Sequence, residues 1–176
     1  MGMCKAVFDA YMNYDETETL ARVIVGEDEV PLNISLLDGS DRDLAKGEAC
    51  GAFLWSTDYE MTAYPTEEEY YEKDDSHMAS VSMIPMGTFP AEPEQKDFQQ
   101  NAFILFSGIV REAERNPKPE EGAPLWRLQI ETYALTFDLF SFEEEQVLPG
   151  YVVHGHAWLY GTLKRIPEND RGEKAK

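Results

Sequence analysis

One pair of residues is spaced for metal chemistry: His154 and His156, separated by Gly155. In an extended strand, residues two apart point to the same face, so both imidazoles could approach one ion. A transition-metal site needs a third and usually a fourth protein ligand, and the neighbouring sequence names none. We therefore expect no metal and no cofactor here. The strand is instead predicted to offer a ligand-binding face, formed by His154, His156, Trp158 and Tyr160.

Other patterns that could carry catalysis or ion binding fail on their spacing. The acidic stretch at residues 38–43 (DGSDRD) begins like a calcium loop, but Asp43 stands where the loop needs glycine and Ala49 where it needs glutamate. No GxSxG, GxGxxG or GxxxxGK motif occurs, and Cys50 has no histidine near it in sequence. The sequence therefore favours a non-enzymatic binding protein, and a metal-dependent enzyme is the weakest alternative.

Net charge is the strongest compositional signal. The chain holds 34 acidic and 15 basic residues, for a formal charge of −19. Such a field repels nucleic acid and anionic membranes and attracts cationic proteins. We predict a basic protein as the partner, with this chain acting as an inhibitor or immunity-type protein. The predicted partner-binding residues form two acidic clusters: Glu67, Glu68, Glu69, Asp74, Asp75, Glu143, Glu144 and Glu145.

Length and cysteine content limit the possible domain organisation and localisation of the protein. With 176 residues, the chain is predicted to form one β-rich domain over residues 1–166, followed by a frayed tail at 167–176. An N-terminal lobe over 1–100, packed on a barrel over 101–166, is the alternative. Two cysteines without a CxxC pair, no secretory signal and no apolar stretch of 18 residues predict a cytoplasmic protein without a membrane span.

The first half alternates short strand patterns with acidic turns. Strands are expected at residues 5–11, 19–25 and 31–37, and a long extended segment at 49–64. A short helix is expected over 67–73, because Thr66 and Glu69 form a capping box. A second helical turn is expected over 142–148.

The second half has a more specific pattern. Strands are expected at residues 101–113, 125–134, 136–142 and 151–163, and Gly108 stands inside the first of them. This order of strands resembles an OB-type small β-barrel over residues 101–165, with a further strand contributed by residues 49–64 or 77–84 as an open alternative. The resemblance implies a mainly β fold that binds ligands on one face and its flanking loops, so an OB-like small-ligand-binding module is the alternative function. A β-sandwich is the alternative fold.

Overall fold

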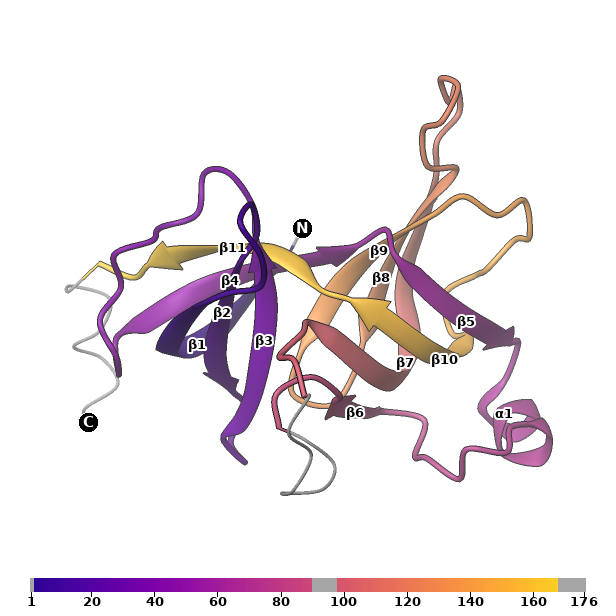
Figure 1. Ribbon diagram of the computed structural model, residues 1–176. Helices are drawn as coiled ribbons and strands as arrows, with labels where there is room; N and C mark the ends of the chain where they lie inside the picture. Colours follow the sequence, from indigo (N-terminus) through magenta and orange to yellow (C-terminus); the bar gives the residue numbers. More distant parts are fainter. Residues whose placement is uncertain (1, 90–97, 168–176) are drawn as a thin grey trace. The chain divides into compact units, whose positions relative to one another are not determined.

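The computed structural model describes residues 2–89 and 98–167. The chain divides into two compact units (Figure 1). Unit 1 comprises Met1–Leu54, Pro85–Ala102 and Leu159–Lys176, and unit 2 comprises Trp55–Ile84 and Phe103–Trp158. Most of the tail predicted at 167–176 lies outside the described residues.

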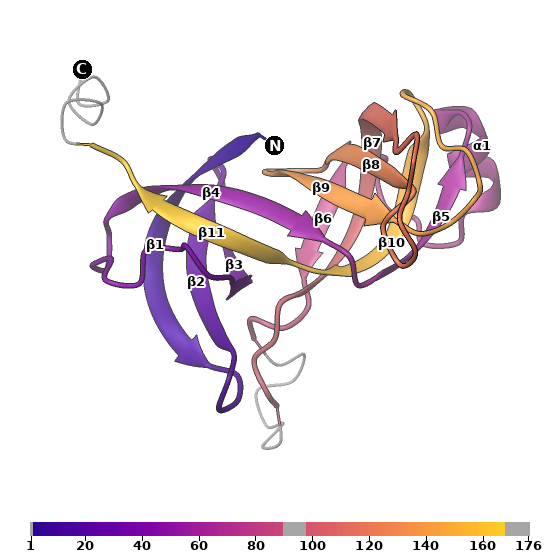
Figure 2. The same ribbon diagram turned by 90° about the horizontal axis from the view of Figure 1, so that it is seen from above.

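Unit 1 is a closed five-stranded barrel. Its strands are β1 (Met3–Asn13), β2 (Thr19–Val25), β3 (Val30–Leu36), β4 (Ala49–Ser56) and β11 (Tyr160–Arg165). The neighbours run in the order β1-β2-β3-β11-β4, and β4 also pairs with β1, which closes the ring (Figure 2). The β3–β11 pair is parallel, whereas β1–β2, β2–β3 and β1–β4 are antiparallel. A mainly β fold with an OB-like barrel is therefore confirmed.

The closed ring draws on different strands from those that suggested it. The sequence pattern pointed to residues 101–165 with a strand from 49–64 or 77–84. The ring uses β1 to β4, of which β4 lies within 49–64, and only the last strand of 101–165. Alternation of apolar and polar residues identifies strands without identifying their partners. The parallel contact that brings Ser35 beside Tyr160 joins residues far apart in the sequence, and no local pattern encodes it.

The core of unit 1 is built from apolar side chains of its strands, and β3 buries consecutive residues on both of its faces. Leu20, Val23, Leu32 and Ile34 are all fully buried. Asn33, which is 2% exposed, is one of the buried polar residues of this unit, with Ser35 and Thr88. Its Nδ2 donates to the carbonyl oxygens of Gly87 and Asn101, both at 3.1 Å, and so anchors the chain on either side of residues 90–97.

Unit 2 contains the remaining strands and the helix. They are β5 (Tyr59–Tyr64), α1 (Glu67–Lys73), β6 (Ser82–Pro85, its last residue belonging to unit 1), β7 (Phe103–Arg115), β8 (Trp126–Glu131), β9 (Thr136–Ser141) and β10 (Val152–Trp158). The neighbours run in the order β9-β8-β7-β10-β5, and β6 pairs with β7. Buried side chains from β7, β8 and β9 fill this unit, among them Phe106, Leu128, Ile130 and Phe137.

The two units repeat one pattern of pairing. Each contains a three-stranded antiparallel meander, β1-β2-β3 or β7-β8-β9, and a fourth strand, β4 or β10, that pairs with the first strand of its meander. The third strand of each meander has a parallel neighbour: β11 for β3, and Trp55–Ser56 at the end of β4 for β9. The chain continues from β4 into β5 and from β10 into β11, so each fourth strand is followed by a strand of the other unit.

Local predictions fared unevenly. Helix α1 has the predicted bounds, and the Thr66 side chain accepts a hydrogen bond from the Glu69 amide. The helical turn predicted at 142–148 is wrong: no helix forms there, and the Glu143 amide donates to Ser141 Oγ instead. The strand expected at 151–163 is interrupted at Leu159, whose amide donates to the Ala102 carbonyl oxygen. No helix in the described ranges is long and apolar enough to cross a membrane.

Candidate functional site

The histidine face predicted from the sequence lies on β10. His154 is paired with Thr62 of β5 and Ser107 of β7, and His156 with Glu60 of β5. The Nδ1 atom of His154 lies 2.8 Å from Ser107 Oγ, and His156 Nε2 lies 3.9 Å from the Glu60 carboxylate. Both imidazoles therefore lie on the same side of the sheet, as their spacing predicts.

A chain of hydrogen bonds occupies the inner end of this face. Ser107 is fully buried, and its Oγ lies 2.7 Å from the Tyr70 hydroxyl, which donates to the Met78 carbonyl oxygen at 2.8 Å. Tyr70 is the one buried residue of α1. These hydrogen bonds therefore attach α1 to the sheet. The Ser107 hydroxyl is fully buried, so a substrate has no access to it.

A cavity of about 340 Å³ lies over the outer end of the face. It is lined by Glu60, Met61, Thr62, His154, Gly155 and His156. No group of three or more His, Cys, Asp or Glu side chains within residues 2–89 and 98–167 could hold a metal ion. Trp158 is only 6% exposed and packs edge-on against Phe103, and Tyr160 belongs to unit 1. The structure thus brings the two histidines together, with Trp158 in the core and Tyr160 in the other unit.

Much of the acidic cluster around α1 is engaged within unit 2. Glu67 accepts a hydrogen bond from Ser80 Oγ at 2.7 Å, and Glu69 forms an ion pair with Lys73 at 3.5 Å. Asp74 accepts from the Tyr64 hydroxyl at 2.8 Å. Glu68 and Asp75 are exposed. Three of the five predicted partner-binding residues here therefore already have intramolecular partners.

The Asp74–Tyr64 contact shifts both pKa values. Burial alone would raise the pKa of Asp74, but hydrogen bonds from Ser76 and Tyr64 outweigh it and lower the pKa below its usual range. Burial, together with the neighbouring Asp74 carboxylate, raises the pKa of Tyr64 to about 12. The pair therefore consists of a carboxylate and a neutral phenol at neutral pH, an arrangement that ties the end of α1 to β5.

The acidic segment 143–145 is more accessible. It follows β9, and all three glutamates are exposed. Glu144 approaches the Arg115 guanidinium at 3.8 Å with 85% of its own side chain exposed. This long contact leaves the carboxylates of Glu143, Glu144 and Glu145 open to a partner.

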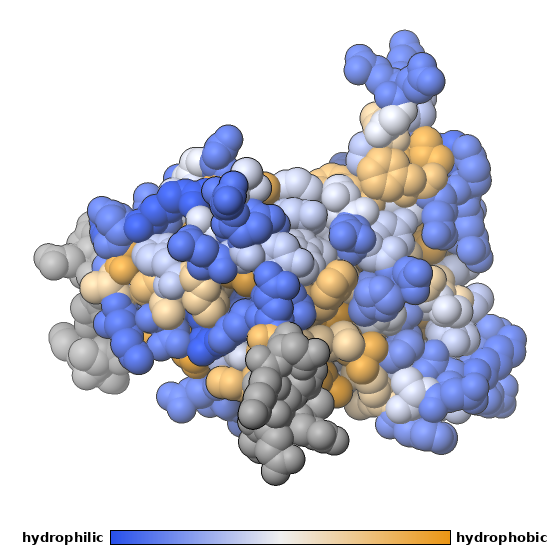
Figure 3. Space-filling model, viewed as in Figure 1, coloured by the Kyte–Doolittle hydropathy of each residue, from blue (hydrophilic) through white to orange (hydrophobic). Residues whose placement is uncertain are grey.

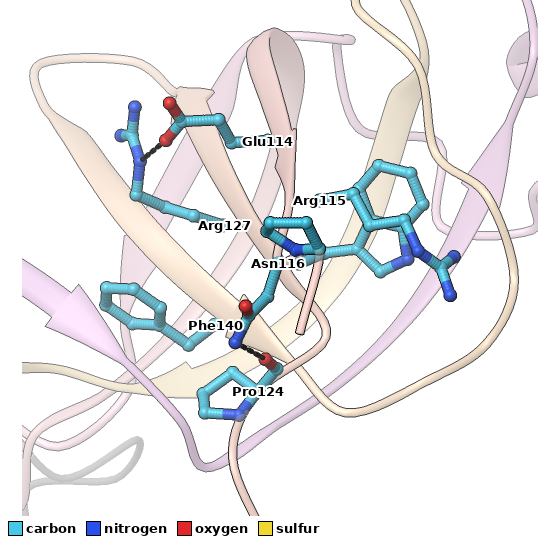
Figure 4. Close-up of a pocket in the computed structure, with 8 residues that line it drawn as sticks. Glu114, Arg115, Asn116, Pro124, Arg127 and Phe140 are labelled. Atoms are coloured by element: carbon cyan, nitrogen blue, oxygen red, sulfur yellow. Dashed lines mark hydrogen bonds and ion pairs between the residues drawn. The ribbon is translucent and has the colours of Figure 1, made fainter. Parts of the chain in front are cut away.

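Arg115 belongs to a second cavity, of about 390 Å³, at the end of the β7–β8 hairpin (Figure 4). Figure 4 shows side chains from the hairpin and from β9 around it. We call this cavity the Trp126 groove, and it is lined by Glu114, Arg115, Asn116, Pro117, Pro124, Trp126, Arg127 and Phe140. Trp126 is 8% exposed, and the Arg115 guanidinium lies 5.4 Å from the centre of its ring.

Arg127, at the edge of this groove, is surrounded by carboxylates. It donates to Glu112 at 2.9 Å, to Glu114 at 3.0 Å and to the buried Asp138 at 3.1 Å. Hydrogen bonds from Arg127 to Glu114 and Glu112 raise the pKa of the guanidinium further above its usual range. One cation facing three carboxylates leaves this edge of the groove with a negative charge.

The sequence pattern does not reveal the Trp126 groove, because its lining comes from β7, β8, β9 and the turn between β7 and β8. The available signal was a turn with three prolines, residues 116–124, bracketed by Arg115 and Trp126. Comparison with known proteins adds no precedent for the site, because no family model, no curated protein and no solved structure matches the chain.

Proposed function

We propose that this chain is a non-enzymatic binding protein that engages a basic protein partner through the acidic surface of unit 2. The observation that supports this proposal is the uneven distribution of charge between the units. Unit 2 holds 17 acidic and 5 basic residues, whereas unit 1 holds 17 acidic and 10 basic residues. The formal charges are therefore −12 and −7, which together make the −19 of the chain.

The cations of unit 2 are largely neutralised within it. Lys73, Arg111, Arg115 and Arg127 all form ion pairs with carboxylates of the same unit. Seven of the 17 carboxylates pair with Lys, Arg or His: Glu60, Glu69, Glu112, Glu114, Glu131, Asp138 and Glu144. The other ten form no ion pair with Lys, Arg or His in the part of the chain that the structure describes, although Glu67 and Asp74 accept hydrogen bonds from Ser80 and Tyr64. These ten form the negative surplus that a cationic surface would meet.

Exposure supports the same assignment. Figure 3 shows hydrophilic residues covering α1 and the tip of the β7–β8 hairpin, and the segment 143–145 is exposed as well. Carboxylates distributed in this way steer a basic protein toward unit 2 and speed association at low salt. Cys4 and Cys50 are free thiols, which supports our proposal that the protein works in the cytoplasm.

A matched pair of variants tests the proposal. The triple substitution E143Q/E144Q/E145Q removes three charges from unit 2, and E16Q/E27Q/D28N removes three exposed charges from unit 1. Binding of purified cytochrome c and lysozyme, two cationic proteins, is measured by biolayer interferometry at 0.05 and 0.5 M NaCl. We expect the unit 2 variant to lose about tenfold in affinity at low salt and the unit 1 variant to lose little.

Two outcomes would contradict the proposal. Equal losses in the two variants would mean that net charge alone attracts cationic proteins, with no preferred surface. Binding that survives 0.5 M NaCl undiminished would mean that carboxylates do not carry the interaction, because screening at that ionic strength suppresses contacts between exposed charges.

A further inference from the structure

We infer that the Trp126 groove is the binding site for an extended peptide segment of the partner that carries lysine or arginine. This inference rests on the proposed function and names the site and the chemistry of the bound segment. It is carried by three features of the groove: an acidic rim, an aromatic and prolyl lining, and a buried indole N–H with no acceptor.

The rim is acidic on more than one side. Glu112 and Glu114 extend from β7 toward Arg127, and Glu144 reaches Arg115 from the segment after β9. Glu120 and Glu121 are exposed in the β7–β8 turn. The two arginines at the groove are thus opposed by at least four carboxylates, so the net charge around the opening is negative. This charge complements lysine and arginine side chains.

The lining is apolar where it is most buried. Trp126, Phe140, Pro117 and Pro124 contribute rings to it, and Phe140 is held edge-on by Trp55 at 5.9 Å between ring centres. Aromatic and prolyl surfaces of this kind take up apolar side chains or the aliphatic stems of lysine and arginine. The groove therefore suits a segment that combines cations with apolar groups.

The indole of Trp126 points to a ligand with acceptor oxygens. Its Nε1–H is buried and finds no acceptor among residues 2–89 and 98–167. A buried donor without a partner is destabilising, so an acceptor that reaches it when the Arg115 guanidinium moves off the Trp126 ring gains affinity. The backbone carbonyl groups of an extended peptide supply such acceptors at regular spacing, while its basic side chains reach the rim.

Other macromolecules fit these features less well. A nucleic acid would bring phosphates to a rim of carboxylates, and the groove arginines are already paired. A neutral oligosaccharide could stack on the aromatic rings, but it would leave the acidic rim without a counter-charge. A basic peptide uses all three features together.

The test uses two labelled peptides that differ only in apolar content: acetyl-Arg-Leu-Arg-Leu-Arg-Leu-amide and acetyl-Arg-Ser-Arg-Ser-Arg-Ser-amide. Binding to the full chain is followed by fluorescence anisotropy and by the indole N–H resonances of the three tryptophans, assigned with Trp→Phe variants. We expect the leucine peptide to bind at least fivefold more tightly and to shift the Trp126 resonance as it saturates.

A matched pair of phenylalanine variants locates the site. Phe140 lines the groove, whereas Phe142 is 47% exposed and does not line it. F140A should weaken the leucine peptide at least fivefold and F142A should leave it unchanged, with the dispersion of the amide spectrum confirming that both variants fold.

Three results would overturn the inference. They are an unmoved Trp126 resonance on saturation, equal affinities for the two peptides, and a Trp126 shift produced by cellohexaose but by neither peptide. If E143Q/E144Q/E145Q weakens cytochrome c binding while neither peptide shifts the Trp126 resonance, the proposed function survives and the groove assignment falls. If neither triple variant affects protein binding, the proposed function itself falls.

Discussion

Among single residues, Arg127 has the clearest energetic role. It is the cation beside Asp138, a carboxylate that is 2% exposed. We expect Arg127→Leu to lower the free energy of unfolding by about 2 kcal/mol or more, because it leaves the Asp138 charge buried without its cation. Urea unfolding followed by circular dichroism measures the loss. The double variant Arg127→Leu/Asp138→Leu should recover most of it, and a double variant as unstable as the single one would refute this account.

Residue types that signal function in a sequence had mixed outcomes here. The spacing of His154 and His156 correctly placed both rings on one face, because alternation in a strand is a local property. The same rule was extended through Trp158 to Tyr160, and it failed to anticipate that the strand breaks at Leu159. Trp126 is buried, and its place in a cavity depends on Phe140 of another strand, which no local pattern encodes.

Among the elements, β10 depends on a glycine at a close approach. A Cβ added to Gly155 would lie 1.9 Å from the backbone oxygen of Glu60, so alanine there must push β5 and β10 apart. We expect Gly155→Ala to lower the free energy of unfolding by about 2–3 kcal/mol. The control is Gly51→Ala in β4, where the added Cβ meets only the flexible and half-exposed Met3 side chain. Equal unfolding midpoints for the two variants would contradict the argument.

Elements with a local signature were predictable, and those that depend on distant partners were not. Strand β2 and helix α1 have the bounds expected from the sequence, because alternation and a Thr66 cap are visible within a few residues. The acidic run 143–145 looked like a helix start, but no apolar stripe accompanies it, and the segment has no regular secondary structure. The repeated pairing pattern of the two units has no counterpart as a sequence repeat, since pairing is set by backbone geometry that many sequences satisfy.

For the whole molecule, the charge of −19 predicts an unusual response to salt. Self-repulsion destabilises a compact state of high net charge, and raising NaCl from 0.01 to 0.15 M shortens the screening length from about 30 to about 8 Å. We therefore expect the melting temperature to rise by several degrees over this range, measured by calorimetry at pH 7. A falling melting temperature would mean that favourable ion pairs such as those of Arg127 outweigh the repulsion.

The closure of the unit 1 barrel by β11 has a consequence for synthesis on the ribosome. Strands β1 to β4 are complete at Ser56, but the strand that lies between β3 and β4 begins only at Tyr160. At about 5–20 residues per second, the intervening stretch of roughly a hundred residues takes on the order of 5–20 s to make. During that interval the nascent chain presents the unpaired edges of β3 and β4, which can pair with other chains. The barrel that contains the first strands to be synthesised is thus among the last parts of the molecule to close. Newly made chains need protection from pairing with other chains until β11 emerges.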